Sequence, residues 1–425
     1  MSAELSSKWF SGLNRSRPWA VIVGGASIGA LGSFATHSIL PALSSIRADL
    51  NSQVGTTQLI VSVALLALGT GQLIVGPLSD RYGRRPVILS GLALYVAASV
   101  AAAFAPRISW LICARALQAF GCGGSIAVSR ATIMDYFGPE RAAVGIAYTA
   151  TAVLLVPMFA PTLGGYLAEF LGWRWIFGIC SGLGIAVFVF TWRRIAETHA
   201  HGSPAASKPG AARNYMHSYR ILLSSPRYLA FMAFGSLLMA SMYTVITGAP
   251  YAVIDVMHLA PSTYGRLFLI PALGSFSGFF LAAKISRRFG AMRMLGIGVG
   301  LGLTTTLTMA VLMLLHYWHP IAIFLPAMVL GFANALSTPS SVSGAIGTHP
   351  EIAGAASGLV GFAQLATSAA ATQLVAALAD HTPIPFALTV LALVLAAFAS
   401  YLVIQRQARD SAPSPDYDGS ETVTL

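Results

Sequence analysis

Twelve apolar stretches, each about as long as a membrane-crossing helix, run along this chain and leave few alternatives for its fold. A helix needs roughly 20 apolar residues to cross the hydrocarbon core of a bilayer. The chain is 56% hydrophobic and only 9% charged, which excludes an ordinary soluble domain. We therefore predict an all-α membrane protein with spans near residues 19–41, 55–77, 87–105, 109–133, 142–167, 174–192, 228–252, 263–283, 292–315, 320–345, 353–378 and 384–404.

The positive charges fall mostly on one side of this twelve-span arrangement. Of the 25 Lys and Arg residues, 20 lie on the side that holds both termini, and one, Arg115, lies inside a span. The other four lie on the opposite side: Arg47, Arg107, Arg174 and Arg266. Because basic loops stay in the cytoplasm, this asymmetry predicts a multi-pass protein with both termini cytoplasmic. The net charge of +11 does not indicate nucleic-acid binding, because it is divided among many short loops.

One long polar segment divides the chain into two halves of six spans. Its content of Gly, Pro, Ser and Lys predicts a flexible, basic cytoplasmic linker. His199 and His201 in this segment lack further ligands at a metal-binding spacing, so we predict no metal site. The predicted organisation is an N-terminal six-helix bundle at 1–193, a linker at 194–226, a C-terminal six-helix bundle at 227–405 and a disordered cytoplasmic tail at 406–425.

The two halves carry a weak internal repeat. The tripeptide 81–83, Arg-Tyr-Gly, follows the second span and is matched after the eighth by 288–290, Arg-Phe-Gly, at an offset of 207 residues. Leu-Pro at 40–41 is matched by Ala-Pro at 249–250, at an offset of 209. Two nearly equal offsets indicate a duplication. Two six-helix halves that flank a site near the middle of the membrane are typical of a secondary transporter.

A cationic turn between the second and third spans is the most distinctive local pattern. Residues 76–86 read Gly-Pro-Leu-Ser-Asp-Arg-Tyr-Gly-Arg-Arg-Pro. Its arginines anchor the turn in the cytoplasm. A second predicted role is a conformational lock, in which Asp80 pairs with an arginine or faces a helix N-terminus. The predicted lock residues are Gly76, Asp80, Arg81, Gly83, Arg84, Arg85 and, as a further partner for Asp80, Arg141.

This turn resembles the loop between spans 2 and 3 that marks the major facilitator superfamily. Residues 115–121, Arg-Ala-Leu-Gln-Ala-Phe-Gly, resemble the fourth-span motif of its proton-coupled members. Residues 160–165, Ala-Pro-Thr-Leu-Gly-Gly, resemble the core of the fifth-span motif of drug exporters. Together with these, residues 58–91 look most like the Bcr/CflA group of drug:proton antiporters, as do the short stretches 40–43 and 172–177.

The resemblance implies the major-facilitator fold, with 12 transmembrane helices in two six-helix bundles. It implies a bacterial inner-membrane exporter that exchanges small amphipathic compounds for protons as the two bundles rock. It also implies that Asp80 meets the start of the eleventh span, near 353–358, in the outward-facing state.

The chain departs from the resembled group in its first span. The group carries an Asp three residues before the Leu-Pro that ends this span, whereas this chain has His37. No acid lies in the middle of a predicted span, so His37 is the remaining candidate proton carrier, and an imidazole titrates near neutral pH. A neutral, hydrogen-bonded histidine that lines the pore is the alternative. In the fifth span, Ala147, Val156 and Ala160 stand where the resemblance expects glycines.

Arg115 is the one Lys or Arg well inside a predicted span. An arginine at the membrane centre costs roughly 2.5–3.5 kcal/mol on insertion scales, so it should face the bundle interior or an aqueous cavity. We predict that it takes part in proton coupling with His37 or contacts substrate. A structural arginine that satisfies backbone carbonyls is the alternative. Repulsion between Arg115 and a protonated His37 would either help release the proton or keep His37 neutral.

The fifth span combines helix-bending and small residues: Pro157, Pro161, Gly164 and Gly165. This pattern predicts either a surface that seals the cavity against leak or ordinary close packing. Polar and aromatic residues inside other spans predict a largely apolar substrate cavity, with ordinary packing as the alternative for each of them. The predicted cavity residues are Gln58, Gln118, Met158, Tyr243, Thr247, Asn334, Phe362 and Gln364.

The predicted partners are a small-molecule substrate, protons and the lipid bilayer, and we expect a monomer without cofactors. Because the chain lacks the motif H-E-x-x-H and acids at membrane depth, we do not predict an enzyme. Cys113, Cys122 and Cys180 fall within spans and predict no disulfide. An importer, or a facilitator without proton coupling, remains the alternative because the first-span Asp is missing.

Overall fold

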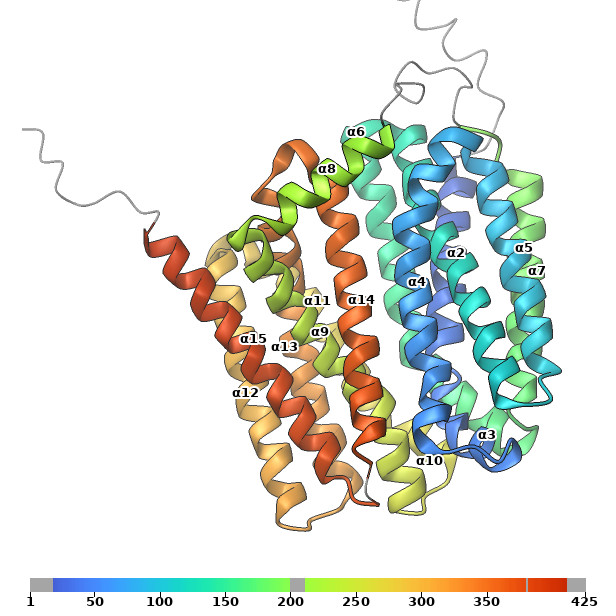
Figure 1. Cartoon of the computed structure of the whole chain (residues 1–425), viewed down its shortest axis with the longest axis vertical. Coiled ribbons are helices and arrows are strands. Elements are labelled where there is room, and N and C mark those ends of the chain that lie inside the picture. The colour runs from blue at the N-terminus through green and yellow to red at the C-terminus, as the bar shows by residue number, and fades with distance from the viewer. Residues whose placement is uncertain (1–17, 199–210, 380, 411–425) are drawn as a thin grey trace, which may run out of the picture.

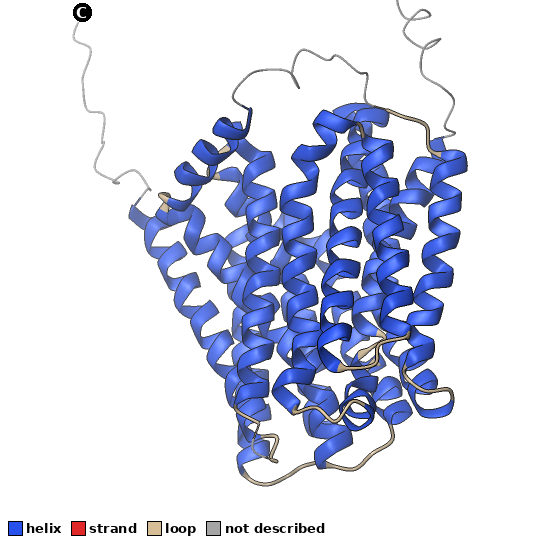
Figure 2. Cartoon of the chain, turned by 45° about the vertical axis from the view of Figure 1, so that its right-hand side comes forward, coloured by secondary structure: helices blue, strands red, loops and turns tan. Residues whose placement is uncertain are grey.

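The computed structural model describes residues 18–198, 211–379 and 381–410, and these residues fold into helices and short connections (Figure 2). Eleven of the described helical segments are long and apolar enough to cross a membrane. The remaining predicted span, 142–167, lies in the second half of a 63-residue helix that continues past a non-helical Gly138 (φ 71°, ψ 167°). Side chains at 139–144 and at several positions up to 154 lie outside the described part.

The first bundle consists of long helices and a broken end to its first span. It contains α2 (Pro18–His37), α3 (Leu43–Asp49), α4 (Val54–Tyr82), α5 (Arg84–Ala103), α6 (Ile108–Phe170) and α7 (Arg174–Arg194), with a short 3-10 segment η1 (Leu40–Ala42). Pro41 lies inside η1. Since proline cannot donate the backbone hydrogen bond that an α-helix needs, the α-helical pattern of the first span is interrupted there.

The second bundle repeats this plan. It contains α9 (Pro226–Pro250), α10 (Pro261–Leu267), α11 (Leu269–Phe289), α12 (Ala291–Leu314), α13 (Pro320–Gly347), α14 (Ala353–Ala377) and α15 (Ile384–Asp410), with a π-helical segment η2 (Tyr251–Val256) and a 3-10 segment η3 (Pro350–Ile352). Pro250 ends α9, just as Pro41 follows α2. The backbone thus breaks at matching places in the two halves.

Two glycines give the clearest structural match between the halves. Gly83 separates α4 from α5 with φ 94° and ψ 152°, and Gly290 separates α11 from α12 with φ 75° and ψ 158°. Residues other than glycine rarely adopt this backbone conformation. The repeated Arg-aromatic-Gly tripeptides therefore end at the same tight corner in each bundle.

The linker and the tail differ from their predicted form. Residues 211–223 form helix α8 (Ala211–Leu223), which packs on α14 and α9, so the prediction of a flexible linker was wrong for this part. The reason is an apolar stripe: Leu222 is fully buried and Tyr219 packs against the core. Helix α15 extends to Asp410, so the first five residues of the predicted disordered tail, 406–410, are helical.

The two bundles meet along α4 and α14, which lie side by side in Figure 1, and where α6 contacts α10 and α11. The largest hydrophobic cluster crosses between the bundles at one end, where Ile46 and Ile176 of the first bundle join residues such as Val253 and Tyr264 of the second. A separate cluster that includes Ile88 stays within the first bundle. The apolar core is therefore shared at one end of the molecule.

Hydrogen bonds join the bundles at that same end. The Thr162 hydroxyl donates to the Gly265 carbonyl at 2.7 Å, and the Glu169 carboxylate accepts from the Ser262 backbone N–H at 3.1 Å. We call this end, which carries α3 and α10, the gate end. In Figure 1 it lies opposite α8.

A glutamine clamp adds to these contacts. The Gln373 side chain of α14 accepts from the Ser62 hydroxyl at 3.1 Å and donates to the Gly55 carbonyl at 3.0 Å. One side chain of the second bundle thus contacts the first and third turns of α4. Under the predicted topology the gate end faces the periplasm.

Candidate functional site

The cationic turn is organised around Arg84. Its guanidinium contacts the Asp80 carboxylate at 2.6 Å and the Asp135 carboxylate at 2.9 Å, and it also donates to the Ser79 hydroxyl. The Arg84 side chain is only 10% exposed, whereas those of Asp80 and Asp135 are 38% and 29% exposed. One arginine therefore ties the end of α4 to α6 through two carboxylates.

Glu197 holds the same turn from the end of the sixth span. Its carboxylate accepts from the backbone N–H groups of Arg84 and Arg85, at 3.0 and 3.1 Å, at the N-terminus of α5. Unpaired N–H groups and the helix dipole favour a negative charge at this position. A Cβ on Gly83 would lie 2.8 Å from the same carboxylate, which adds to the need for glycine. We did not predict a role for Glu197, and only its place just after a span could have indicated one.

The other predicted lock residues lie around this centre. The Arg85 guanidinium donates to the Trp192 carbonyl at 2.7 Å, and the Arg81 guanidinium lies 5.4 Å from the Tyr82 ring centroid. Gly76 borders open space. The Arg141 side chain lies outside the described part of the chain.

The described contacts of the cationic turn all lie within the first bundle. Asp80 is paired with Arg84 rather than with the start of α14, although Leu73 of α4 lies near Gly358, at 3.9 Å from the position of an added Cβ. The predicted contact between Asp80 and α14 concerns the outward-facing state, and it stays a prediction.

Arg115 lies in the interior of the first bundle and is 1% exposed. It donates to the Gln118 side chain, which in turn donates to the Ser99 hydroxyl of α5 at 2.6 Å. Its guanidinium lies 6.0 Å from the ring centroid of Phe177 in α7. The described contacts of Arg115 therefore lead to α5 and α7, and its Nε has no partner among the described residues.

His37 lies where the two bundles meet. Its Nδ1 lies 2.8 Å from the Ser33 carbonyl, and its ring centroid is 6.3 Å from that of Tyr243 in α9. The side chain is buried, with 7% exposed. His37 and Arg115 were predicted to act together, but their described contacts lead to different helices, so the structure does not bring them into contact.

The fifth-span glycines mark very close approaches of the backbone. A Cβ on Gly164 would overlap the Ser38 carbonyl oxygen of the first bundle. A Cβ on Gly165 would lie 2.6 Å from the Pro261 carbonyl oxygen of the second bundle. Pro161 is buried one turn away, and its carbonyl oxygen would lie 2.7 Å from a Cβ on Gly265. Pro157 is half-buried one turn further along α6.

An ion pair that we did not predict completes the gate end. The Arg47 guanidinium of α3 contacts the Asp255 carboxylate of η2 at 2.8 Å, and the two side chains are 29% and 17% exposed. The two residues are 208 positions apart, between the offsets of 207 and 209 that relate the halves. The internal repeat was thus the signal that could have found this pair, because matching positions meet where two related bundles touch.

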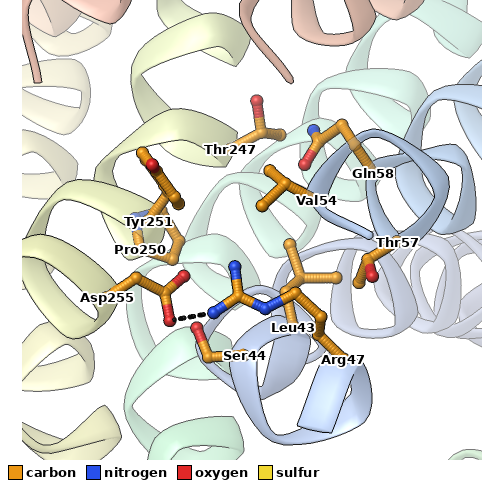
Figure 3. Close-up of a pocket in the computed structure, with 10 residues that line it drawn as sticks. All are labelled: Leu43, Ser44, Arg47, Val54, Thr57, Gln58, Thr247, Pro250, Tyr251 and Asp255. Atoms are coloured by element: carbon orange, nitrogen blue, oxygen red, sulfur yellow. Dashed lines mark hydrogen bonds and ion pairs between the residues drawn. The ribbon is translucent and has the colours of Figure 1, made fainter. Parts of the chain in front are cut away.

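A small pocket lies beside this ion pair (Figure 3). About 30 Å³ of it is open to water-sized molecules, which is room for water rather than for a drug. Gln58 and Thr247, two of the predicted cavity residues, line it from opposite bundles. Tyr243 lies one turn from Thr247 on α9, and its carbonyl accepts from the Thr247 hydroxyl at 2.8 Å.

The other predicted cavity residues are not gathered around this pocket. Phe362 of α14 packs close to Gly69 of α4, and Met158 is half-buried in α6. The Asn334 side chain donates to the Leu238 carbonyl at 2.8 Å, inside the second bundle. Gln364 is buried next to Gly235 of α9, and its side-chain nitrogen has no partner among the described residues.

Comparison with known proteins agrees with this architecture. The chain is 27% identical to multidrug resistance protein D of Escherichia coli over 340 residues, which cover 78% of this chain and 82% of that one. It is 24% identical to a bicyclomycin resistance protein homolog of Haemophilus influenzae, covering 88% and 94%. These relatives confirm the predicted likeness to the Bcr/CflA group.

Solved structures confirm the predicted fold. The chain superposes on a bacterial homolog of the lysosomal transporter Spinster with a TM-score of 0.72 at 16% identity, covering 94% of this chain and all of that one. The profile of the Major Facilitator Superfamily matches residues 23–372. The prediction of a transporter rather than an enzyme is thereby also confirmed. The chain is a multi-pass membrane transporter that belongs to the Major Facilitator Superfamily.

Proposed function

We propose that this protein exports small amphipathic compounds across a bacterial inner membrane in exchange for protons, with both termini in the cytoplasm and as a monomer. In such a transporter the two bundles would rock so that the central site opens to one side of the membrane at a time. The distribution of contacts between the bundles supports this mechanism. Polar contacts and a shared apolar core join the bundles at the gate end. The described contacts of the cationic turn remain in the first bundle. A gate end that joins the bundles, together with a cationic turn whose described contacts stay in one bundle, supports rocking between two states.

The names of the relatives support drugs as cargo, because multidrug resistance protein D and a bicyclomycin resistance protein homolog are similar to this chain over most of its length. Expression in a host that lacks its major efflux pumps tests export directly. We expect higher minimum inhibitory concentrations for several lipophilic drugs, and no gain with Asp80→Asn or Arg115→Ala. An unchanged susceptibility profile for the wild-type protein, despite its presence in the membrane, would count against drug export.

His37 is the proposed proton carrier, because it is the titratable side chain buried where α2 meets Tyr243 of the other bundle. His37→Ala is expected to lower transport driven by a pH gradient by about tenfold, within the usual range of coupling between two sites, while substrate exchange without a gradient persists. The measurement is substrate flux in everted vesicles with and without the gradient. His217→Ala, at an exposed position of α8, serves as the control. If His37→Ala kept normal coupling, His37 would have no role in it.

A facilitator or importer without proton coupling is the second candidate, and one observation favours it. The position where the resembled group carries an acid holds His37, with a hydrogen-bonded ring. Substrate flux that ignores collapse of the pH gradient would select this candidate.

A further inference from the structure

The ion pair at the gate end differs from the other described ion pairs of the molecule because it joins the two bundles. Asp49 with Arg174 and Arg84 with its two carboxylates each lie within the first bundle. Arg47 with Asp255 connects α3 of the first bundle to η2 of the second. The rocking of the bundles proposed above must therefore break this pair when the gate end opens.

Asp255 is also the one described carboxylate that lines the pocket between the bundles. The other described acids have partners elsewhere. Glu169 binds a backbone N–H at the outer edge of the gate, and the remaining acids bind other partners outside the pocket: Asp49, Asp80, Asp135, Glu197 and Glu351. A positively charged compound that reaches the pocket thus meets one described carboxylate, Asp255, which is paired with Arg47.

The contact between Arg47 and Asp255 leaves unused capacity on both sides. One guanidinium nitrogen contacts one carboxylate oxygen, and Figure 3 draws no hydrogen bond from Arg47 to the second oxygen of Asp255. The Ser44 side chain also forms a hydrogen bond with this carboxylate, and His258 interacts with it electrostatically. A carboxylate can accept about four hydrogen bonds, and a guanidinium can donate five. Single-point ion pairs are less specific than bidentate ones, so another cation can compete for Asp255.

The small size of the pocket means that a cation can compete with Arg47 for Asp255 only when the gate end opens. In the closed gate only about 30 Å³ is accessible, so an organic cation fits beside Asp255 only if Arg47 moves away and the bundles separate. A ligand that binds one of two conformations better shifts the population towards it. Binding at Asp255 would therefore favour the outward-open state.

We propose that Asp255 binds a cationic group of the transported compound, which takes the place of Arg47 and so releases the gate. Gln58, Thr247 and Tyr251 lie around this carboxylate and would contact the uncharged part of the compound. The proposal deepens the export function proposed above by naming organic cations as one class of cargo. It rests on that function for the direction of transport, but not for binding.

Two substitutions that break the same ion pair separate this proposal from a purely structural role. The probe is tetraphenylphosphonium, a lipophilic cation, whose dissociation constant is measured on the purified full chain by calorimetry without any gradient. Asp255→Asn removes its binding partner, and we expect the dissociation constant to rise about tenfold. Arg47→Gln removes the competitor, and we expect the dissociation constant to fall about fivefold.

Three further measurements act as controls. Chloramphenicol, a neutral compound, should bind both variants within about twofold of the wild type, which also shows that they are folded. Asp255→Glu keeps the carboxylate and should keep cation binding. Asp49→Asn breaks an ion pair at the same end but within the first bundle, and it should leave cation binding unchanged.

Opposite shifts for the two variants would support the proposal. It would be overturned if Arg47→Gln weakened cation binding as Asp255→Asn does, since both changes would then act only by breaking the pair. Normal cation binding by Asp255→Asn, or no saturable binding by the wild type, would overturn it too. A protein that showed the expected binding pattern but exported nothing would contradict the export function and leave the cation site standing.

Discussion

Replacing Arg84 by Gln is expected to abolish most transport and to lower the free energy of unfolding of the first bundle by about 2 kcal/mol. The substitution leaves two carboxylates, Asp80 and Asp135, without the guanidinium that pairs with both. The loss is smaller than for a fully buried ion pair, because solvent screens the partly exposed carboxylates. Thermal unfolding in detergent and drug efflux from cells measure the two effects.

Arg81→Gln is the matched control for Arg84→Gln. Arg81 lies in the same turn and carries the same charge, but it is exposed and its described contact is the Tyr82 ring. We expect its replacement to change stability by less than about 0.5 kcal/mol. Equal losses for both variants would show that the charge of the turn matters rather than the network around Arg84.

Gly165→Ala is expected to shift the protein strongly towards the state in which the gate end is open. The added Cβ would lie 2.6 Å from the Pro261 carbonyl oxygen of the opposite bundle, so the closed gate must deform. Overpacking of this kind costs about 1–3 kcal/mol, which corresponds to a shift of roughly 5- to 150-fold in the ratio of the two states. Export should fall in parallel, because the protein returns more slowly to the state that accepts cytoplasmic substrate.

Spin-label distances across the gate measure this shift. Labels at Arg107 and Tyr317, exposed positions before α6 and after α12, report the separation of the bundles when the native cysteines have been replaced. Gly182→Ala in α7 is the control, because its Cβ would meet open space.

Gly164→Ala should instead destabilise the first bundle, since its clash with Ser38 lies within that bundle. An unchanged distance distribution for Gly165→Ala would argue against a sealing role for the fifth span.

The architecture could be predicted because hydrophobic length and loop charge act locally along the chain. Spans end where the apolar run ends. The Arg-aromatic-Gly tripeptides indicated a duplication, and their glycines, Gly83 and Gly290, form matching corners in the two halves. The sequence did not predict helix α8, because its apolar stripe stabilises a helix only when α14 and α9 cover it in the folded protein.

The site was harder to predict because it depends on which helix faces each residue packs against. Arg115 and Gln118 lie inside span four as expected, yet their contacts lead to α5 and α7. Asp255 lies beyond the predicted end of its span at residue 252, but the helix continues through η2, where this acid contacts Arg47. Only the repeat offset connects these two residues in the sequence.

The central claim, proton-driven export, is tested most directly in proteoliposomes with an acidic interior. The measurement is uptake of the compound that shows the largest resistance in the susceptibility panel. We expect accumulation above the equilibrium level as protons leave, and its loss when nigericin collapses the pH gradient. Accumulation that never exceeds equilibrium, or that is unchanged after collapse of the gradient, would contradict proton-coupled export.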